Sequence, residues 1–416
     1  MNITVIGGGI IGLCSAYSLS KAGHEVTVID SGTCGAGASE GNAGWMVPAL
    51  SQPFNAPGAM SDAIKAMLHP DSAIRFQTFP NVDFMKWVAL FYRNSSEVNS
   101  ATARQALVTL NDQTIELFDK MLLDVKAEVQ HDGLLLPFRS EASMDGFLAS
   151  HAQIQQAGYA GRAVSITPER LTTMEPALAA GMVGGVHLVD EKSVRPESFS
   201  GGLVAWLHST GARILENCAV RKLEQTSRGW AIETDNGTHL ADQVVVAAGA
   251  ASARILRTTG VKLALEPGRG CSITVTEGPV LHRPVKLADV RVACTPFESG
   301  TRFSGTFDFA GHTNSSSLGR MKSVLRHASH YFPALANLQP AATQVWSGLR
   351  PCTPDSVPYI GAVPDKPGLL VATGHGTLGM TLGPVTGDAI AGIVGNEPIP
   401  PHIRACAVDR PQVRLV

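Results

Sequence analysis

The sequence lacks paired cysteines and blocks of like charge, features that identify several large classes of protein. Its seven cysteines are odd in number and never stand in a Cys-x-x-Cys spacing, at positions 14, 34, 218, 271, 294, 352 and 406. This argues against a disulfide framework and against a zinc site, and we expect no bound metal. The formal net charge is only -2 and no block of like charges stands out, so we expect no nucleic-acid partner.

Long apolar runs are also missing. The sequence offers no stretch of about 20 uncharged apolar residues, the length a membrane-spanning helix needs. We expect no signal peptide, because a strand-like run at residues 3–6 opens the chain. The segment 63–92 is rich in Met, Leu, Phe and Trp with a few basic residues. It fits a peripheral membrane contact or, as we prefer, helices packed over a substrate lobe. We therefore expect a cytoplasmic protein, with contact to the inner face of the membrane left open.

The opening of the chain is its first positive signal. TVIGGG, IIGLCSAYSLSKAG and HEVTVID predict a strand, a helix and a second strand around Gly7, Gly9 and Gly12. Glycines at this spacing allow a tight turn and a close backbone approach to a pyrophosphate. Asp30 follows Gly12 by 18 residues, where a carboxylate can accept hydrogen bonds from an adenosine ribose. The pattern predicts a dinucleotide site but does not separate NAD from FAD.

The rest of the chain alternates between two kinds of region. Apolar spacing predicts helices within 60–130, at 196–208 and at 316–331, and strands at 133–138, 184–190, 212–249 and 268–309, before a last strand, glycine-rich turn and helix. We predict an α/β fold with two interleaved domains. A discontinuous Rossmann-like domain would comprise 1–60, 191–261 and 345–416, and an α+β domain with a mixed sheet 61–190 and 262–344.

Several motifs resemble those of one family. GASEGNAG (37–44), VVVAAGA, SGLRPCTPDSVPYIG and TGHGTLGMT together resemble the FAD-dependent D-amino-acid dehydrogenases and the related glycine and sarcosine oxidases. The resemblance covers nearly the whole chain. It implies an FAD-binding domain of the D-amino-acid oxidase type, with the flavin extended across it, and a substrate domain that roofs the flavin ring.

Carried over by position, the resemblance implies a set of FAD contacts. They are Gly7, Gly9, Ile10, Ile11, Gly12, Asp30, Ser31, Ser39, Asn42, Ala43, Gly44, Val220, Ala248, Gly249, Gly374, His375, Gly376, Thr377, Leu378 and Gly379. A helix that starts near Leu378 would direct free N–H groups at the flavin ring and stabilise its reduced form. His375 is a candidate catalytic residue or flavin neighbour, although a histidine between glycines also satisfies local backbone groups.

Arg350 is the second candidate catalytic residue. A guanidinium offers a planar fork of donors that suits a carboxylate, and the resemblance makes Arg350 the anchor of the substrate carboxylate. The alternative is that it pairs with Asp355 or with carbonyl groups at a domain seam. Cys352 and Thr353 stand where the oxidases carry a second arginine, which favours a dehydrogenase. A second carboxylate contact stays open among Arg269, Arg291, Arg302, Tyr159 and Tyr331.

The resemblance implies oxidative deamination of a D-amino acid. A hydride would pass from the α-carbon to FAD, the imino acid would hydrolyse to keto acid and ammonia, and a quinone, another carrier or O2 would take the electrons. We expect non-covalent FAD, because Glu40 and Gly41 replace the tethering histidine of other relatives and Cys352 is poorly spaced for attachment. The alternatives are oxidation of a secondary or cyclic amine (D-proline, hydroxy-D-proline, sarcosine) or of glycine, an NAD enzyme, and a non-catalytic FAD-binding subunit.

Overall fold

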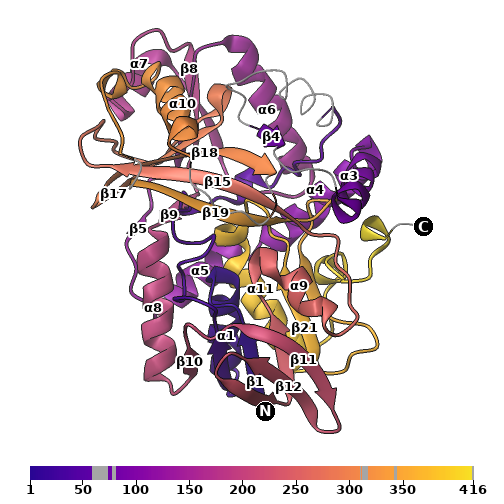
Figure 1. Ribbon diagram of the computed structural model, residues 1–416. Coiled ribbons are helices and arrows are strands. Elements are labelled where there is room, and N and C mark those ends of the chain that lie inside the picture. Colours follow the sequence, from indigo (N-terminus) through magenta and orange to yellow (C-terminus); the bar gives the residue numbers. More distant parts are fainter. Residues whose placement is uncertain (59–73, 77–80, 310, 312–316, 342–343, 415–416) are drawn as a thin grey trace.

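The computed structural model describes residues 1–58, 74–76, 81–309, 311, 317–341 and 344–414 (Figure 1). The predicted membrane-contact segment 63–92 therefore lies partly outside the described residues. Within them, every helix is too short or too polar to cross a membrane. Two large sheets organise the chain, and the mixed α/β fold predicted from the sequence is confirmed.

The first sheet confirms the predicted Rossmann-like unit. Its strand order is β10-β2-β1-β14-β21-β20. The bounds are β1 Asn2–Ile6, β2 Glu25–Ile29, β10 Arg213–Leu215, β14 Gln243–Val246, β20 Tyr359–Ala362 and β21 Leu369–Thr373. All neighbours pair in parallel except β20, which is antiparallel to β21. Strands that are covered on both faces can be apolar throughout, which explains runs such as QVVV and LLVAT.

Helices cover one face of this sheet and a small meander covers the other. Helices α1 (Ile10–Lys21), α8 (Pro196–Ser209) and α11 (Gly379–Val394) share a core with the sheet. A Cβ at Gly387 would lie 2.4 Å from the carbonyl oxygen of Cys14, so glycine is what lets α11 approach α1. On the other face lies the predicted meander of β11 (Val220–Thr226), β12 (Gly229–Thr234) and β13 (Gly237–Ala241). Its hairpin turns at Gly237, whose φ is +114°.

The second sheet has nine strands and is mixed, as predicted. Its order is β19-β15-β18-β17-β16-β6-β8-β7, with β4 also paired to β18. The bounds are β4 Ile74–Phe76, β6 Leu134–Phe138, β7 Ala163–Ile166, β8 Gly184–Leu188, β15 Glu266–Val275, β16 Val285–Leu287, β17 Val292–Phe297, β18 Gly300–Phe309 and β19 Val345–Cys352. Figure 1 shows β15, β18 and β19 crossing the middle of the molecule, between α10 (Leu318–Ser329) and the first sheet.

The two faces of the second sheet differ in character. On β15, Cys271, Ile273 and Val275 point into a core shared with α10. The alternate residues Gly268, Gly270 and Ser272 pair with Arg350, Gly348 and Trp346 of β19, so these six lie on the opposite face. This second face meets the loop that follows β2, because a Cβ at Gly41 would lie 2.1 Å from the Trp346 ring. We call it the glycine face.

Helices fill much of the predicted helical region. They are α3 Val82–Asn94, α4 Glu97–Asn111 and α5 Thr114–Leu122, followed later by α6 Glu141–Gln156, α7 Pro168–Met174 and α9 Ser252–Arg257. The prediction of helix throughout 60–130 is wrong at residues 74–76, which form β4, and at β5 (Val129–Gln130). β5 joins β3 (Trp45–Met46) and β9 (Lys192–Val194) in a small sheet. The domain boundaries stay a prediction. Strand β19 pairs in the nine-stranded sheet, although it falls inside the last predicted cofactor-domain segment.

A buried ion pair fastens the C-terminal segment to the turn after β19. Arg410 Nε lies 2.7 Å from Asp355 Oδ2, and Arg410 Nη2 lies 2.9 Å from Oδ1. The guanidinium also donates to carbonyl oxygens of Val357 and Pro358, and both charged side chains are about 5% exposed. Because Arg410 occupies Asp355, this carboxylate is not the partner of Arg350.

We expect Arg410→Met to destabilise the fold strongly, because Asp355 would remain buried without its partner. Removing one member of such a pair costs about 3–5 kcal/mol of unfolding free energy, which urea denaturation would measure. Arg414→Met is the matched control, since the Arg414–Asp409 pair is largely exposed and exposed pairs contribute little. Adding Asp355→Asn to Arg410→Met should recover part of the loss. Equal stability of the Arg410 and Arg414 variants would contradict this role.

Candidate functional site

The predicted cofactor residues gather at one edge of the first sheet. Gly7 and Gly9 follow β1, Asp30 follows β2, Ala248 follows β14 and Gly374 follows β21. The carboxyl ends of parallel strands share one edge, which is where open α/β sheets bind ligands. Val220 opens β11, and the backbone N–H of nearby Cys218 donates to the carbonyl oxygen of Asp30 at 2.8 Å. The structure thus brings these distant segments to the same edge.

The glycine turn leaves no room for side chains. Gly7 has φ +107°, and a Cβ there would lie 2.5 Å from the Ala247 carbonyl oxygen. A Cβ at Gly12 would lie 1.8 Å from the Gly7 carbonyl oxygen. Helix α1 begins directly after Gly9 without a side-chain cap, so its first N–H groups are suited to an anion. Ser39 Oγ accepts from Ile10 N at 3.0 Å and adds a hydroxyl group at this helix end.

Asp30 is held in a defined position at the end of β2. Its Oδ2 accepts from Gly8 N at 2.6 Å and its Oδ1 from Gly32 N at 2.8 Å. These backbone donors fix the carboxylate beside the glycine turn. Its neighbour Ser31 is exposed at the same strand end. A contact to a ribose stays a prediction for both residues.

Arg302 holds the loop that carries Ser39, Asn42, Ala43 and Gly44. Its Nη1 donates to the carbonyl oxygens of Glu40 and Asn42, both at 3.0 Å, and its Nη2 lies 2.5 Å from Glu197 Oε1. The Ala43 carbonyl oxygen accepts from Thr295 Oγ1 at 2.8 Å. A Cβ at Gly44 would lie 2.0 Å from the Val194 carbonyl oxygen, and its φ is +74°. The loop is therefore fixed by β17, β18 and β9.

Arg350 lies on the glycine face and has no acidic partner in the part of the chain that the structure describes. Its Nη1 donates to the Thr306 carbonyl oxygen at 3.1 Å, and its Cζ lies 5.3 Å from the centre of the Phe307 ring. Among the described residues no carboxylate lies within ion-pair distance of this guanidinium. Burial lowers the pKa of Arg350 from its ordinary value, yet a guanidinium stays protonated. A partly buried cation with spare donors is suited to binding a carboxylate.

The sheet is irregular where this guanidinium lies. Thr306 and Phe307 of β18 stand opposite the single residue Gly270 of β15, which is the arrangement of a β-bulge. Thr306 has φ +67°, a conformation that is an outlier for a β-branched residue. A Cβ at Gly270 would lie 2.1–2.2 Å from Nη1, Nη2 and Cζ of Arg350. We call Gly270 and Thr306 the guanidinium seat.

The sequence offered five side chains as a second carboxylate contact, and four are committed to acids. Arg302 pairs with Glu197, Arg269 Nη2 lies 3.5 Å from Asp308, Tyr159 donates to Glu191 at 2.5 Å and Tyr331 donates to Asp289. The fifth, Arg291, is exposed in a left-handed turn. Sequence reasoning missed Gly270 and Thr306 instead. The only available signal was a glycine inside a strand, which often marks a bulge or a close contact.

The glycine-rich turn before α11 joins the two halves of the site. Gly376 N donates to the Pro351 carbonyl oxygen at 2.9 Å, and His375 forms a bridge with Cys352. The turn therefore lies next to the strand of Arg350. Helix α11 starts at Gly379 after Leu378, without a side-chain cap, so its free N–H groups face the same sheet edge. Thr377 completes this turn.

His375 points into the protein. Its Nε2 lies 3.0 Å from Thr386 Oγ1 on α11, and the side chain is 4% exposed. Burial lowers the pKa of His375 to about 3, so the ring is neutral at physiological pH. This placement favours a structural role over acid or base catalysis. Contact with the flavin stays a prediction.

These residues fit FAD as a non-covalent cofactor. Two helix ends whose N-cap residues, Gly9 and Leu378, supply no side-chain cap meet at one sheet edge with a turn that excludes side chains. This arrangement favours phosphates and a negatively charged reduced flavin. Cys352 is fully buried among Trp87, Phe91 and Phe309, and burial raises the pKa of its thiol to about 12. An inert thiol does not favour attachment. Among the described residues no His, Cys, Asp or Glu group is arranged to hold a metal ion.

Comparison with known proteins agrees with this geometry. The family described as FAD dependent oxidoreductase matches residues 2–393. A D-amino acid dehydrogenase from Neisseria gonorrhoeae is 29% identical over 408 residues, 95% of this chain and 96% of that protein. One from Paramagnetospirillum magneticum is 30% identical over 427 residues, 99% of each. The crystal structure of glycine oxidase from Geobacillus kaustophilus superposes with a TM-score of 0.77 at 23% identity, covering 98% of both chains.

We expect Gly270→Ala to displace the Arg350 guanidinium, because the new methyl group needs the space of that group. The arginine side chain is flexible at its end, so the fold should persist while carboxylate binding weakens. The dissociation constant of benzoate, measured by calorimetric titration, should rise about tenfold or more, or roughly 1.4 kcal/mol. Gly201→Ala on α8, where the methyl group meets open space, is the matched control. Equal benzoate affinity in both variants would contradict the seat.

Proposed function

The chain belongs to the family of FAD-dependent oxidoreductases that act on amino acids or amines, and from this premise we propose that its substrate is a D-amino acid. The proposed reaction converts the amino acid to an imino acid, which hydrolyses to a keto acid and ammonia. When bound, FAD accepts the hydride from the α-carbon and passes the electrons on. The two D-amino acid dehydrogenases that align over almost their whole length support this substrate class.

Arg350 is the observation that carries the proposal. The four most deeply buried arginines that the structure describes all have an acid within 4.0 Å: Arg269 and Arg320 share Asp308, Arg302 has Glu197 and Arg410 has Asp355. Arg350 has a backbone carbonyl group and open donors instead. A substrate carboxylate would supply the missing negative charge and orient the substrate at the same time.

Chemistry at the α-carbon would need little else from the chain. Held by its carboxylate on Arg350, the amino acid lies beside the turn that precedes α11, since β19 and that turn are joined by the Gly376–Pro351 hydrogen bond. The positive end of α11 stabilises negative charge that develops nearby. His375 cannot take up a proton at neutral pH, because its pKa is about 3. We therefore propose that the substrate amine binds in its neutral form.

Specific observations keep two alternatives in view. The fold similarity to a glycine oxidase allows oxidation of glycine or of a secondary or cyclic amine such as sarcosine or D-proline. A non-catalytic FAD-binding subunit would also need the uncapped helix ends. A non-catalytic subunit would not explain why the Arg350 guanidinium is held without an acid.

We propose a quinone or another carrier as the electron acceptor, with O2 as the alternative, and a peripheral membrane contact that would bring the protein to a quinone. Helix α3 supports the contact, since Val82, Met85, Ala89 and Tyr92 form an exposed stripe at helical spacing. The opposite side of α3 is buried, with Phe84, Trp87 and Phe91 in a core. Amphipathic helices of this kind can lie in a membrane surface.

We expect Arg350→Met to lower kcat/KM for the best D-amino acid about 100-fold, because a charged hydrogen-bonded contact is worth about 3 kcal/mol. FAD content should not change. The substrate is first identified by anaerobic bleaching of the flavin absorbance with D-amino acids, glycine, sarcosine and D-proline, followed by reoxidation with air or a quinone. Arg326→Met, at an exposed position on α10, is the control.

The outcomes separate the proposals. Bleaching by D-amino acids and reoxidation by quinone support the dehydrogenase, and bleaching by sarcosine or glycine alone supports the amine alternative. A yellow protein that none of these compounds bleaches would support the third possibility, a non-catalytic FAD-binding subunit. If kcat/KM in Arg350→Met equals that of the unmodified protein, Arg350 does not bind the substrate.

We expect Met85→Glu combined with Tyr92→Glu to reduce co-sedimentation with vesicles that contain anionic lipid severalfold, because charges on the stripe oppose burial in the lipid surface. Leu123→Glu is the matched control, since Leu123 is 86% exposed just beyond α5. Activity with a water-soluble acceptor should be unchanged. Unaltered vesicle binding in the double variant would remove α3 as the membrane contact.

A further inference from the structure

Lys286 of β16 lies on the same face of the nine-stranded sheet as Arg350. Its neighbours Val285 and Leu287 belong to the core shared with α10, and successive side chains of a strand point to opposite faces. The lysine side chain is therefore directed to the glycine face, where it is partly buried. Lys286 adds a second cation to the face that carries Arg350.

Short side chains lie between Lys286 and β19. Lys286 pairs with Ala293, Ala293 with Ser304, Ser304 with Ser272, and Ser272 with Trp346. These residues form one row across five strands, and all of them lie on the glycine face. The three in the middle are alanine and serines, whose small side chains leave room for a ligand along the row.

The loop that is predicted to contact FAD borders this row. Thr295 is the next residue of β17 on the glycine face after Ala293. Its hydroxyl group donates to the Ala43 carbonyl oxygen at 2.8 Å and accepts from Trp45 Nε1 at 2.9 Å. Ala43 is one of the predicted FAD contacts. A ligand on the row between Lys286 and Arg350 would therefore lie beside the loop that is predicted to hold the cofactor.

Lys286 has no acidic partner among the described residues. Four other lysines form ion pairs with acids within 4.0 Å, whereas Lys286 forms none; the four are Lys21, Lys120, Lys192 and Lys222. Burial, with a smaller contribution from the positive charge of Arg291, lowers the pKa of Lys286 to about 8. The amine is still mostly protonated at neutral pH. Buried lysines are usually paired with an acid, so an anion from outside the chain would complete this environment.

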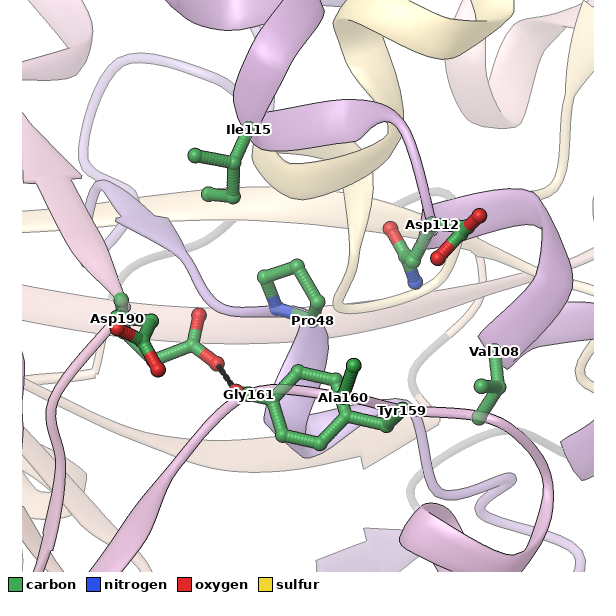
Figure 2. Close-up of a pocket in the computed structure, with 10 residues that line it drawn as sticks. Pro48, Val108, Asp112, Ile115, Tyr159, Ala160, Gly161 and Asp190 are labelled. Atoms are coloured by element: carbon green, nitrogen blue, oxygen red, sulfur yellow. Dashed lines mark hydrogen bonds between the residues drawn. The ribbon is translucent and has the colours of Figure 1, made fainter.

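The neighbouring pocket does not supply that anion. Strand β6, which pairs with β16, contributes to an apolar cluster against which Tyr159 packs. Tyr159 also lines a pocket with Asp112, Asp190 and Glu191 (Figure 2). Glu191 accepts a hydrogen bond from the Tyr159 hydroxyl group, and none of the three acids is among the charges that shift the pKa of Lys286. The acids of this pocket are therefore separate from the row.

The spacing of the two cations sets the size of the ligand. From Gly270 on β15, which lies against the Arg350 guanidinium, to Lys286 on β16 the sheet crosses three strand spacings, about 14 Å. The four-carbon stem of lysine covers part of this gap. One carboxylate group does not fill the rest, whereas a short chain with a carboxylate at each end does.

Resting on the oxidation proposed above, we propose that the substrate is a dicarboxylic D-amino acid, with its α-carboxylate on Arg350 and its side-chain carboxylate on Lys286. D-Glutamate and D-aspartate are the simplest members of this class. An ammonium group forms a strong charge-assisted hydrogen bond with a carboxylate. A neutral side chain would leave Lys286 buried and unpaired, so the same residue selects against neutral amino acids.

Binding is tested without turnover, by calorimetric titration of glutarate and valerate into the FAD-bound protein at pH 7. The two acids have the same chain length, but valerate carries one carboxylate. We expect glutarate to bind about tenfold tighter or more, the value of roughly one charged hydrogen bond. Lys286→Met should remove this advantage, and Arg350→Met should weaken both acids. Lys322→Met, an exposed change on α10, is the matched control.

Turnover supplies the second measurement. D-Glutamate and D-glutamine have nearly the same shape and differ in the charge of the side chain. In Lys286→Met the ratio of their kcat/KM values should fall about tenfold or more, because only D-glutamate loses a charged contact. Lys286→Arg keeps the positive charge and should retain part of the preference for D-glutamate. The ratio in Lys322→Met should equal that of the unmodified protein.

Three results would overturn the role of Lys286. They are equal affinities of glutarate and valerate in the unmodified protein, a ratio of kcat/KM values that Lys286→Met leaves unchanged, and an equal loss for both members of each pair, which a structural role predicts. Oxidation of neutral D-amino acids with no preference for D-glutamate would reject Lys286 and keep the proposed oxidation. Glutarate binding that depends on Lys286 in a protein that oxidises no D-amino acid would reject the oxidation and keep the dicarboxylate site.

Discussion

The contact between β19 and the turn before α11 is what makes the two sheets into one site. The hydrogen bond from Gly376 N to the Pro351 carbonyl oxygen and the bridge between His375 and Cys352 bind the nine-stranded sheet to the edge of the Rossmann-like sheet. Arg350 lies one residue before this junction. The backbone of Arg350 is therefore fixed relative to the N-terminus of α11 by backbone hydrogen bonds, and the seat formed by Gly270 and Thr306 holds its guanidinium.

The chain uses its buried arginines in two ways. Those that pair with an acid join segments: Arg302 fastens the loop of Glu40 and Asn42, and Arg410 fastens the C-terminal segment. Arg350 is left with a carbonyl group and the Phe307 ring. A buried charge without a partner costs free energy that the fold has to supply, and strain of that kind is usually found at binding sites. The left-handed Thr306 beside it is a second example at the same place.

The parts of the fold that depend on residues close together in the sequence could be predicted from the sequence. The spacing of Gly7, Gly9 and Gly12 was sufficient to predict the turn between β1 and α1. The Asn236-Gly237 dipeptide was sufficient to predict the hairpin. Strand β4 could not be predicted, because its three residues pair with β18 from far along the chain. The role of Arg302 was hidden for the same reason, since its partner Glu197 belongs to helix α8, more than 100 positions earlier in the chain. Sequence motifs identified Arg350, but not what surrounds it.

On the glycine face, glycine is needed both for the guanidinium seat and for the packing of the sheet against the loop after β2. Gly270 makes room for the guanidinium, while Gly41 and Gly348 make room for the Trp346 ring, which packs where the nine-stranded sheet meets the loop after β2. A larger residue at any of these positions would push the sheet away from the loop or the guanidinium away from the sheet. Glycine weakens a strand, so Gly270 in β15 and Gly348 in β19 are best explained by the close approach of the guanidinium and of the Trp346 ring. The same close approach that would roof a flavin would also put the Arg350 cation beside it.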